Sequence, residues 1–102
     1  MQVFDPILSI NEELIKIRRQ IHAHPELCFE EVKTAELVKT KLTEWGISYI
    51  EGLADTGVVG IIKKGEACRA IGLRADMDAL PMQEINQFPH ASLHPGKMHA
   101  CG

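Results

Sequence analysis

Apolar residues recur at helical spacing near the start of the chain. They are Ile7, Ile10, Leu14, Ile17 and Ile21. Steps of three and four residues place them on one stripe, which predicts an amphipathic helix that packs by this stripe against a core. Asp5 and Pro6 are typical of a helix start, with a capping side chain followed by proline at the first helical position. Pro25 ends the helix, because the residue before a proline avoids the helical conformation.

A second helix is predicted for residues 31–45. Its buried stripe consists of Ala35, Val38, Leu42 and Trp45. Gly46 follows directly, and glycine is the residue most suited to the left-handed conformation that ends many helices. Both stripes are explained by core packing alone, so neither requires a ligand.

Three short segments after the helices predict strands, at residues 47–50, 57–62 and 70–75. The last two are almost continuously apolar, which is typical of a sheet buried on both faces. Two helices followed by about three strands predict an α/β layer architecture. Residues 80–102 contain three prolines that break any long element, so an irregular segment is expected there.

The composition is that of an ordinary globular protein. Of 102 residues, 45% are apolar and 25% charged, and the net charge of -3 argues against a nucleic-acid partner. Cys28, Cys68 and Cys101 are odd in number and widely spaced, which favours a reducing compartment over a disulfide framework. Cys28 and Cys68 are interpreted as buried or partly buried small residues. No signal peptide and no membrane-spanning run is visible, so we expect a cytoplasmic protein.

Two groups near the end of the chain could carry chemistry. Asp76 and Asp78 follow the third predicted strand and share one of its faces, where two carboxylates call for a cation, a proton or basic neighbours. A solvated loop explains the same pair. His99 and Cys101 offer an imidazole and a thiolate, ligands that suit zinc. Two ligands do not make a site, and an ordinary loop histidine beside a small thiol is the alternative.

His22, His24 and Glu26 form a third group around Pro25. Two histidines and a carboxylate could bind a metal or relay protons. A histidine at the C-terminus of a helix is also favoured by the helix dipole alone.

Taken in order, three segments resemble the signatures of the aminoacylase/carboxypeptidase metallopeptidase family, family twenty. They are Arg-Arg-x-x-His-x-His-Pro-Glu-Leu-x-Phe-x-Glu at 18–31, Leu-Arg-Ala-Asp-Met-Asp-Ala-Leu-Pro at 73–81 and Pro-Gly-Lys-Met-His-Ala-Cys-Gly at 95–102. The closer match is the branch of hippurate hydrolase, N-acyl-amino-acid amidohydrolases and auxin-conjugate hydrolases. The resemblance implies that residues 1–102 are the N-terminal part of a zinc-peptidase-like α/β catalytic domain.

The resemblance also implies a reaction and its cofactors. The family hydrolyses the amide bond of N-acyl amino acids, using two divalent metals, zinc or manganese, and a glutamate as general base. Cys101 matches a metal ligand of the branch, and Asp78 matches an aspartate that supports the metal site. Asp76 and His99 are expected to line the site. The segment from His22 to Glu26 is expected to have a structural or supporting role.

The sequence departs from the family pattern by ending at Gly102, before the next expected ligand. The general-base glutamate, the other metal ligands and the lid domain, through which the family often forms homodimers, do not occur in it. We therefore expect residues 1–102 alone to be inactive and not to bind two metals stably. The alternative is a non-catalytic interaction module that pairs with a full-length homologue. A minimal single-metal protein using Asp76, Asp78, His99 and Cys101 is a third hypothesis.

Overall fold

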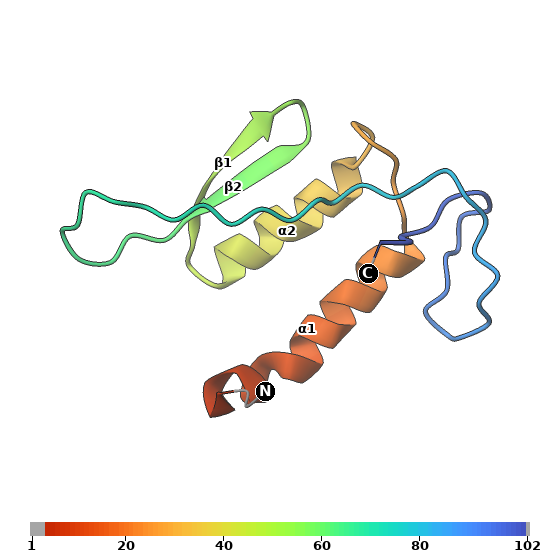
Figure 1. The fold of residues 1–102 in the computed structure, drawn as a ribbon, viewed down its shortest axis with the longest axis horizontal. Coiled ribbons are helices and arrows are strands. Elements are labelled where there is room, and N and C mark those ends of the chain that lie inside the picture. The colour runs from red at the N-terminus through yellow and green to blue at the C-terminus, as the bar shows by residue number, and fades with distance from the viewer. Residues whose placement is uncertain (1–3, 102) are drawn as a thin grey trace. The chain divides into compact units, whose positions relative to one another are not determined.

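The computed structural model describes residues 4–101, which form two compact units (Figure 1). One unit contains Met1–Pro25 and Ala79–Gly102, and the other contains Glu26–Asp78. The first unit thus joins the two ends of the sequence, and the second is one continuous stretch. The assignment of residues 1–102 to part of a single catalytic domain stays a prediction.

Helix α1, Asp5–Ala23, is the regular element of the first unit. Its existence and its end before Pro25 confirm the prediction. Its start differs from the prediction, because Phe4 occupies the capping position and no side chain caps the helix. Asp5 lies inside the first turn instead, where a negative charge interacts favourably with the positive end of the helix dipole.

The apolar stripe of α1 is not buried in a core, although its spacing predicts this. Ile7, Ile10 and Leu14 are exposed, and no residue of α1 is buried. Apart from α1, the described part of this unit is the irregular segment 79–101, whose only regular pairing is an isolated bridge. A single helix and one loop are too little structure to enclose an apolar stripe.

In the second unit, helix α2, Val32–Glu44, ends as the sequence predicts. Gly46 has a φ of 68° and donates its N–H to the Thr43 carbonyl at 3.0 Å. Ile47 donates to the Leu42 carbonyl at 2.8 Å. These two bonds form a Schellman motif, which satisfies carbonyls that the helix leaves unpaired at its end.

Strands β1, Ser48–Leu53, and β2, Gly57–Ile61, form an antiparallel hairpin beside α2 (Figure 1). The register shifts between Glu51 and Leu53, which marks an irregularity in β1. A side chain at Gly60 would come within 3.2 Å of a Leu42 methyl group, so the hairpin approaches α2 closely at this glycine. The helix therefore covers one face of the hairpin.

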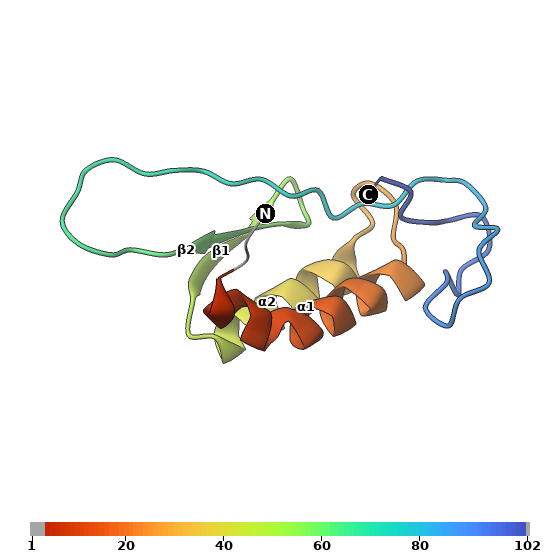
Figure 2. The same ribbon diagram turned by 60° about the horizontal axis from the view of Figure 1, so that its bottom comes forward.

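The prediction of a strand at residues 70–75 is wrong. These residues run as an irregular segment after the hairpin (Figure 2), where Ile71 and Leu73 are 90% and 95% exposed. A strand exists only where a neighbour completes its hydrogen bonds, and no strand among residues 4–101 pairs with this one. The expected burial of both sheet faces is wrong for the same reason, since Val59 and Ile61 of β2 are exposed.

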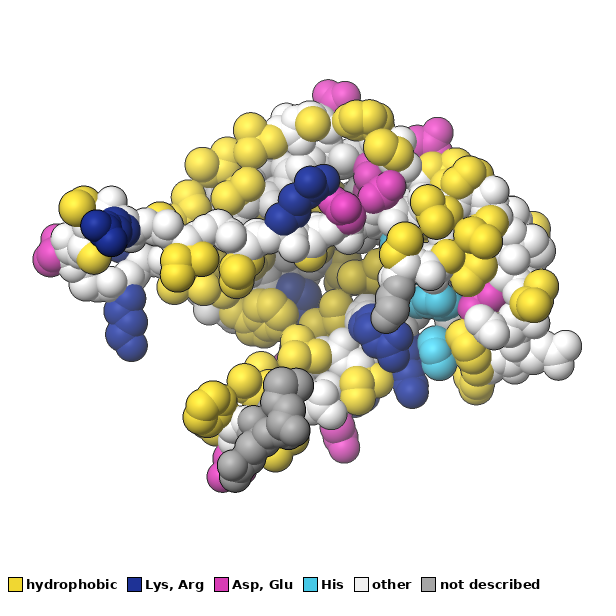
Figure 3. Space-filling model, viewed as in Figure 1, with side chains coloured by type: hydrophobic (Ala, Val, Ile, Leu, Met, Phe, Trp, Pro, Cys, Tyr) yellow, Lys and Arg dark blue, Asp and Glu magenta, His cyan; other side chains and the backbone are white. Residues whose placement is uncertain are grey.

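The apolar core of the described residues is small. Only Pro25, Ala35 and Ala79 are buried apolar residues there. Trp45, predicted to be buried, is exposed. Figure 3 accordingly shows apolar side chains spread over the visible surface.

Among residues 4–101, neither helix combines the length and the apolar character that a membrane crossing requires.

The close turn of the hairpin generates a stability prediction. A Cβ at Gly57 would collide with the carbonyl oxygen of Leu53, whereas one at Gly72 would meet nothing within 4 Å. We expect Gly57→Ala to lower the free energy of unfolding by about 1–3 kcal/mol, and the matched control Gly72→Ala to change it by less than about 0.5 kcal/mol. Urea denaturation followed by circular dichroism measures both. Equal effects of the two substitutions on the free energy of unfolding would contradict the expected collision between a Cβ at Gly57 and the Leu53 carbonyl.

Candidate functional site

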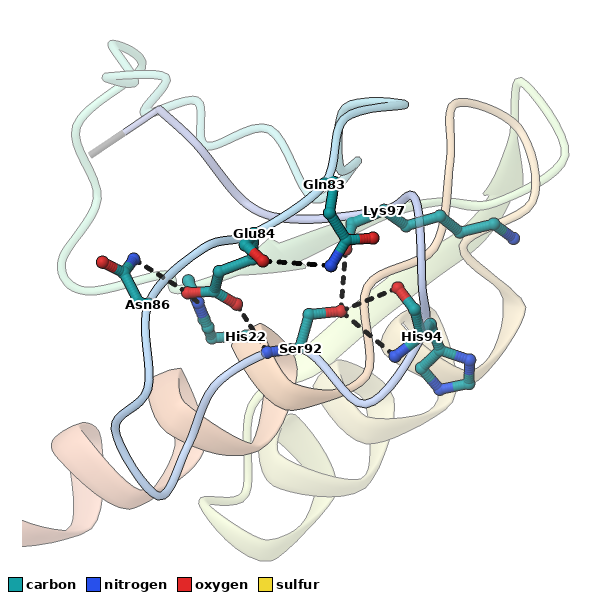
Figure 4. A network of polar contacts seen from close by, with 7 residues as sticks. All are labelled: His22, Gln83, Glu84, Asn86, Ser92, His94 and Lys97. Carbon is teal, nitrogen blue, oxygen red and sulfur yellow. Dashed lines mark hydrogen bonds and ion pairs between the residues drawn. The ribbon is translucent and has the colours of Figure 1, made fainter.

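Glu84 belongs, through its carboxylate, to a network of polar contacts in the first unit (Figure 4). Its side chain is 2% exposed, and its carboxylate accepts three hydrogen bonds. The donors are the Ser92 backbone N–H at 2.5 Å, His22 Nε2 at 2.9 Å and Asn86 Nδ2 at 3.1 Å. A buried carboxylate is costly unless it is satisfied in this way, so these partners make the charge tolerable.

These contacts determine which group donates and which accepts in the Glu84–His22 hydrogen bond. The Ser92 N–H, followed by the bond from His22, lowers the pKa of Glu84 to about 2 against the opposing effect of burial. The carboxylate is therefore ionised at neutral pH and can only accept hydrogen bonds. It follows that Nε2 of His22 carries the proton.

Ser92 continues the network along the chain. Its hydroxyl donates to the Lys97 carbonyl at 2.7 Å and accepts the His94 N–H at 3.2 Å. Gln83 adds a parallel link, since its Oε1 accepts the Gly96 N–H at 2.7 Å. The segment is irregular in backbone conformation but cross-linked by its own side chains (Figure 4).

Backbone contacts fasten this segment at two further points. The Leu93 N–H donates to the carbonyl of Ala23 at 2.9 Å, satisfying a group at the C-terminal end of α1. Leu80 and Met98 exchange two hydrogen bonds, at 2.9 and 3.1 Å. The chain is thus fixed at Met98, three residues before Cys101.

Three histidine rings and Phe88 gather in the same unit. The His22 ring centroid lies 5.9 Å from that of His90 and 6.3 Å from that of His99. Phe88 stacks on His90 at 4.1 Å. Burial and the charge of Arg19 lower the pKa of His90, which favours its neutral form. The histidines appear in cyan in Figure 3.

In the second unit, Glu26 binds the N-terminus of α2. Its carboxylate accepts the Thr34 hydroxyl at 2.6 Å, the Thr34 N–H at 2.7 Å and the Lys33 N–H at 3.1 Å. Burial raises the pKa of Glu26, but these bonds outweigh it and hold the pKa below its usual value. Glu26 therefore caps α2, a structural task of the kind expected for this segment.

The same helix start holds a second carboxylate. Glu31 is buried and accepts the Thr56 hydroxyl at 2.8 Å, which ties the start of α2 to the turn of the hairpin. Further along α2, Lys39 bridges Glu36 and Glu51 at 2.5 and 2.6 Å. Thr56, Lys39 and the two carboxylates that Lys39 bridges line a cleft of about 280 Å³ between α2 and the hairpin. None of the predicted site residues lines this cleft.

Asp76 and Asp78 lie in the irregular end of the second unit, not on a strand. Asp76 is exposed and pairs with Arg74 at 2.8 Å, so it has the basic neighbour that its charge calls for. An ion pair this exposed contributes little stability. Asp78 is half-buried. Neighbouring protein atoms that displace some water from the thiol, followed by the charge of Asp78, raise the pKa of Cys28.

His99 and Cys101 lie in the first unit, where His99 is half-buried and Cys101 is exposed. Cys28 and Cys68 are exposed as well, so their predicted burial is wrong. Between residues 4 and 101, no three metal-binding side chains come together in a way that could hold an ion. The described residues therefore do not form a complete metal site, and the ligand role of Cys101 stays a prediction.

Sequence reasoning missed Glu84 and Ser92. Neither stands at a recognisable helical or strand spacing. The available signal was indirect: an irregular stretch of about twenty residues must satisfy its backbone polar groups with side chains or water.

Comparison with known proteins shows which proteins this chain resembles. The model of Peptidase family M20/M25/M40 matches residues 72–102. Hippurate hydrolase of Campylobacter jejuni is 51% identical over 102 residues, all of this chain and 27% of that protein. IAA-amino acid hydrolase ILR1-like 5 of Arabidopsis thaliana is 54% identical over 89 residues, 87% of this chain and 20% of that protein. N-acyl-L-amino acid amidohydrolase of Geobacillus stearothermophilus is 44% identical over 94 residues, 92% of this chain and 25% of that protein.

A solved structure gives the same answer for the fold. The YxeP protein of Bacillus subtilis, described as a dinuclear metal binding peptidase from the M20 family, matches with a TM-score of 0.87 and 43% identity. The match covers 92% of this chain and 26% of that one. The fold is therefore that of the N-terminal part of an M20 peptidase, as predicted. Within that family, the similar proteins include hippurate, IAA-amino acid and N-acyl amino acid hydrolases, the branch that the motifs resemble. The chain spans about a quarter of their length.

The low pKa of Glu84 generates a pH prediction. Its folded value of about 2 lies below the ordinary 4.5, so the stability it contributes is complete above pH 4.5 and is lost as pH falls toward 2. We expect the carboxyl carbon of Glu84, followed by NMR, to titrate near pH 2, and the Ser92 amide to lose exchange protection over the same interval. A titration midpoint near 4.5 in the folded chain would contradict the described network.

Proposed function

We propose that this chain supplies the N-terminal part of the catalytic domain of a metal-dependent amidohydrolase that cleaves N-acyl amino acids. The observation that carries the proposal is the 51% identity with hippurate hydrolase along all 102 residues. The names of the relatives share one chemistry, the hydrolysis of an amino acid whose nitrogen bears an acyl group. A hippurate-like acyl amino acid is therefore the substrate class that we assign to the whole enzyme.

In this proposal Cys101 provides one thiolate ligand to a pair of zinc or manganese ions. Asp76, Asp78 and His99 line or support that site. The dinuclear metal binding described for YxeP supports two ions in the family. One ligand cannot hold two ions, so hydrolysis needs ligands and a general base from other residues of the enzyme. We accordingly propose that residues 1–102 alone do not hydrolyse the substrate.

We also propose a cytoplasmic enzyme whose partner is a small molecule, with no nucleic acid or membrane involved. The free and exposed thiols of Cys28, Cys68 and Cys101 suit a reducing compartment. The negative net charge suits a small-molecule enzyme better than a nucleic-acid-binding one. Homodimerisation through a lid domain is part of the same proposal.

One observation favours a second candidate, an interaction module that pairs with a full-length homologue. Ile71 and Leu73 are almost fully exposed on a segment that pairs with no strand between residues 4 and 101. Such a segment can add to the edge of a sheet in another chain. Co-purification with a full-length hydrolase, without any gain or loss of hydrolysis, would favour this candidate over the first.

A chimera tests the enzymatic proposal. Residues 1–102 replace the matching 27% of Campylobacter jejuni hippurate hydrolase, and hippurate hydrolysis is followed by the release of glycine. We expect an active chimera that loses activity by at least about 100-fold on Cys101→Ser, because removal of a metal ligand costs affinity and misplaces the ion.

The control is Cys68→Ser, which removes an exposed thiol that is not among the proposed site residues and is expected to keep activity within about twofold. A folded chimera without activity would contradict the proposed function. Full activity of Cys101→Ser would contradict the assignment of the ligand.

A further inference from the structure

We propose that Glu84 is a positioning residue for the segment that carries His99 and Cys101. Glu84 joins this segment to the C-terminal end of α1 through Ser92 on one side and His22 on the other. The inference rests on the proposed function, which gives Cys101 its role, but the placement of the segment can be measured separately.

The first step concerns the hydrogen-bond donors that the buried carboxylate of Glu84 requires. Its ionised carboxylate is almost entirely shielded from water and accepts bonds from three different parts of the unit. Hydrogen bonds to a charged acceptor are shorter and stronger than neutral ones. The donors are held where this charge requires them, because leaving a buried carboxylate unsatisfied costs far more than the bonds return.

The second step follows the contacts from Glu84 along the chain to the residues next to Cys101. The Ser92 N–H is fixed by Glu84, and the Ser92 hydroxyl binds the carbonyl of Lys97. Met98 follows and is paired with Leu80 in both directions. His99 then lies in ring contact with His22, the other partner of Glu84. Two routes from one carboxylate thus reach the residues directly before Cys101.

The third step explains why a carboxylate is needed. A glutamine at position 84 has the same shape, but one of its two terminal atoms becomes a donor. Ser92 N–H faces one oxygen, while His22 Nε2–H and Asn86 Nδ2 face the other. His22 could change its tautomer to accept a hydrogen bond, but a backbone N–H cannot. Glutamine therefore either leaves the Ser92 N–H without an acceptor, or requires His22 to change its tautomer and Asn86 to turn its amide round. In both cases the bonds to a charged acceptor are lost.

The test uses isotope-labelled full chain and NMR. In Glu84→Gln we expect loss of exchange protection at the Ser92 amide by at least about tenfold, which follows from breaking one charge-assisted bond. The backbone signals of His99 and Cys101 move toward positions of an unstructured chain. Glu26→Gln is the matched control, because Glu26 also accepts a backbone N–H but caps α2 in the second unit. It is expected to leave the His99 and Cys101 signals unchanged.

A second pair of variants covers the case in which Glu84→Gln unfolds the unit. His22→Gln keeps a donor toward Glu84, whereas His22→Ala removes it. Both substitutions remove the ring contact with His99, so the signals of Ser92 and Cys101 are compared. We expect displaced Ser92 and Cys101 signals in His22→Ala and near-native Ser92 and Cys101 signals in His22→Gln. Unmoved signals in Glu84→Gln, or equal displacement in both His22 variants, would overturn the proposal.

The chimera supplies the kinetic readout. Displacement of the segment by Glu84→Gln is expected to lower kcat about 10- to 100-fold with little change in KM, since small misplacements of reacting groups have effects of this size. Glu26→Gln is expected to change neither constant. An inactive chimera counts against the proposed function alone, because the NMR result decides the placement of the segment independently. An active chimera with an unchanged kcat in Glu84→Gln would overturn the positioning role.

Discussion

The first unit depends on one buried negative charge. A carboxylate removed from water must find donors nearby, and Glu84 finds them on α1, within its own loop and at Ser92. This unit has almost no apolar core, since Pro25 and Ala79 are the only buried apolar residues described in it. The order of the irregular segment therefore comes from polar contacts of defined geometry. Such contacts fix a conformation more specifically than apolar packing, but they tolerate less change.

The second unit is stabilised by a different kind of contact. Its contacts are mostly local, such as Glu26 on the first turn of α2 and the Schellman motif at Gly46. These features arise from neighbouring residues and form independently of distant parts of the chain. The extended segment with Ile71 and Leu73 is the exception, because it has strand composition but no partner among the described residues. In the proposed enzyme its partner would come from the rest of the catalytic domain.

This difference explains what could be predicted from the sequence. Both helices, the hairpin strands and the cap at Gly46 follow from local spacing and local chemistry, and the structure contains them. The strand at residues 70–75 and the burial of the α1 stripe depend on partners outside the segment, and both predictions failed. The role of Glu84 could not be predicted from the sequence, because its partner His22 lies 62 positions away. Periodicity cannot reveal a pairing of this kind. Residue chemistry made Cys101 one of several candidates, and only the resemblance to a family motif favoured it as a ligand.

The proposed function finally depends on whether Cys101, at the end of the segment that Glu84 orders, binds metal in a complete enzyme. X-ray absorption at the metal edge of the zinc-loaded chimera measures this directly. We expect a sulfur scatterer at about 2.3 Å that disappears in Cys101→Ser. A first coordination shell of nitrogen and oxygen alone, unchanged by that substitution, would contradict it.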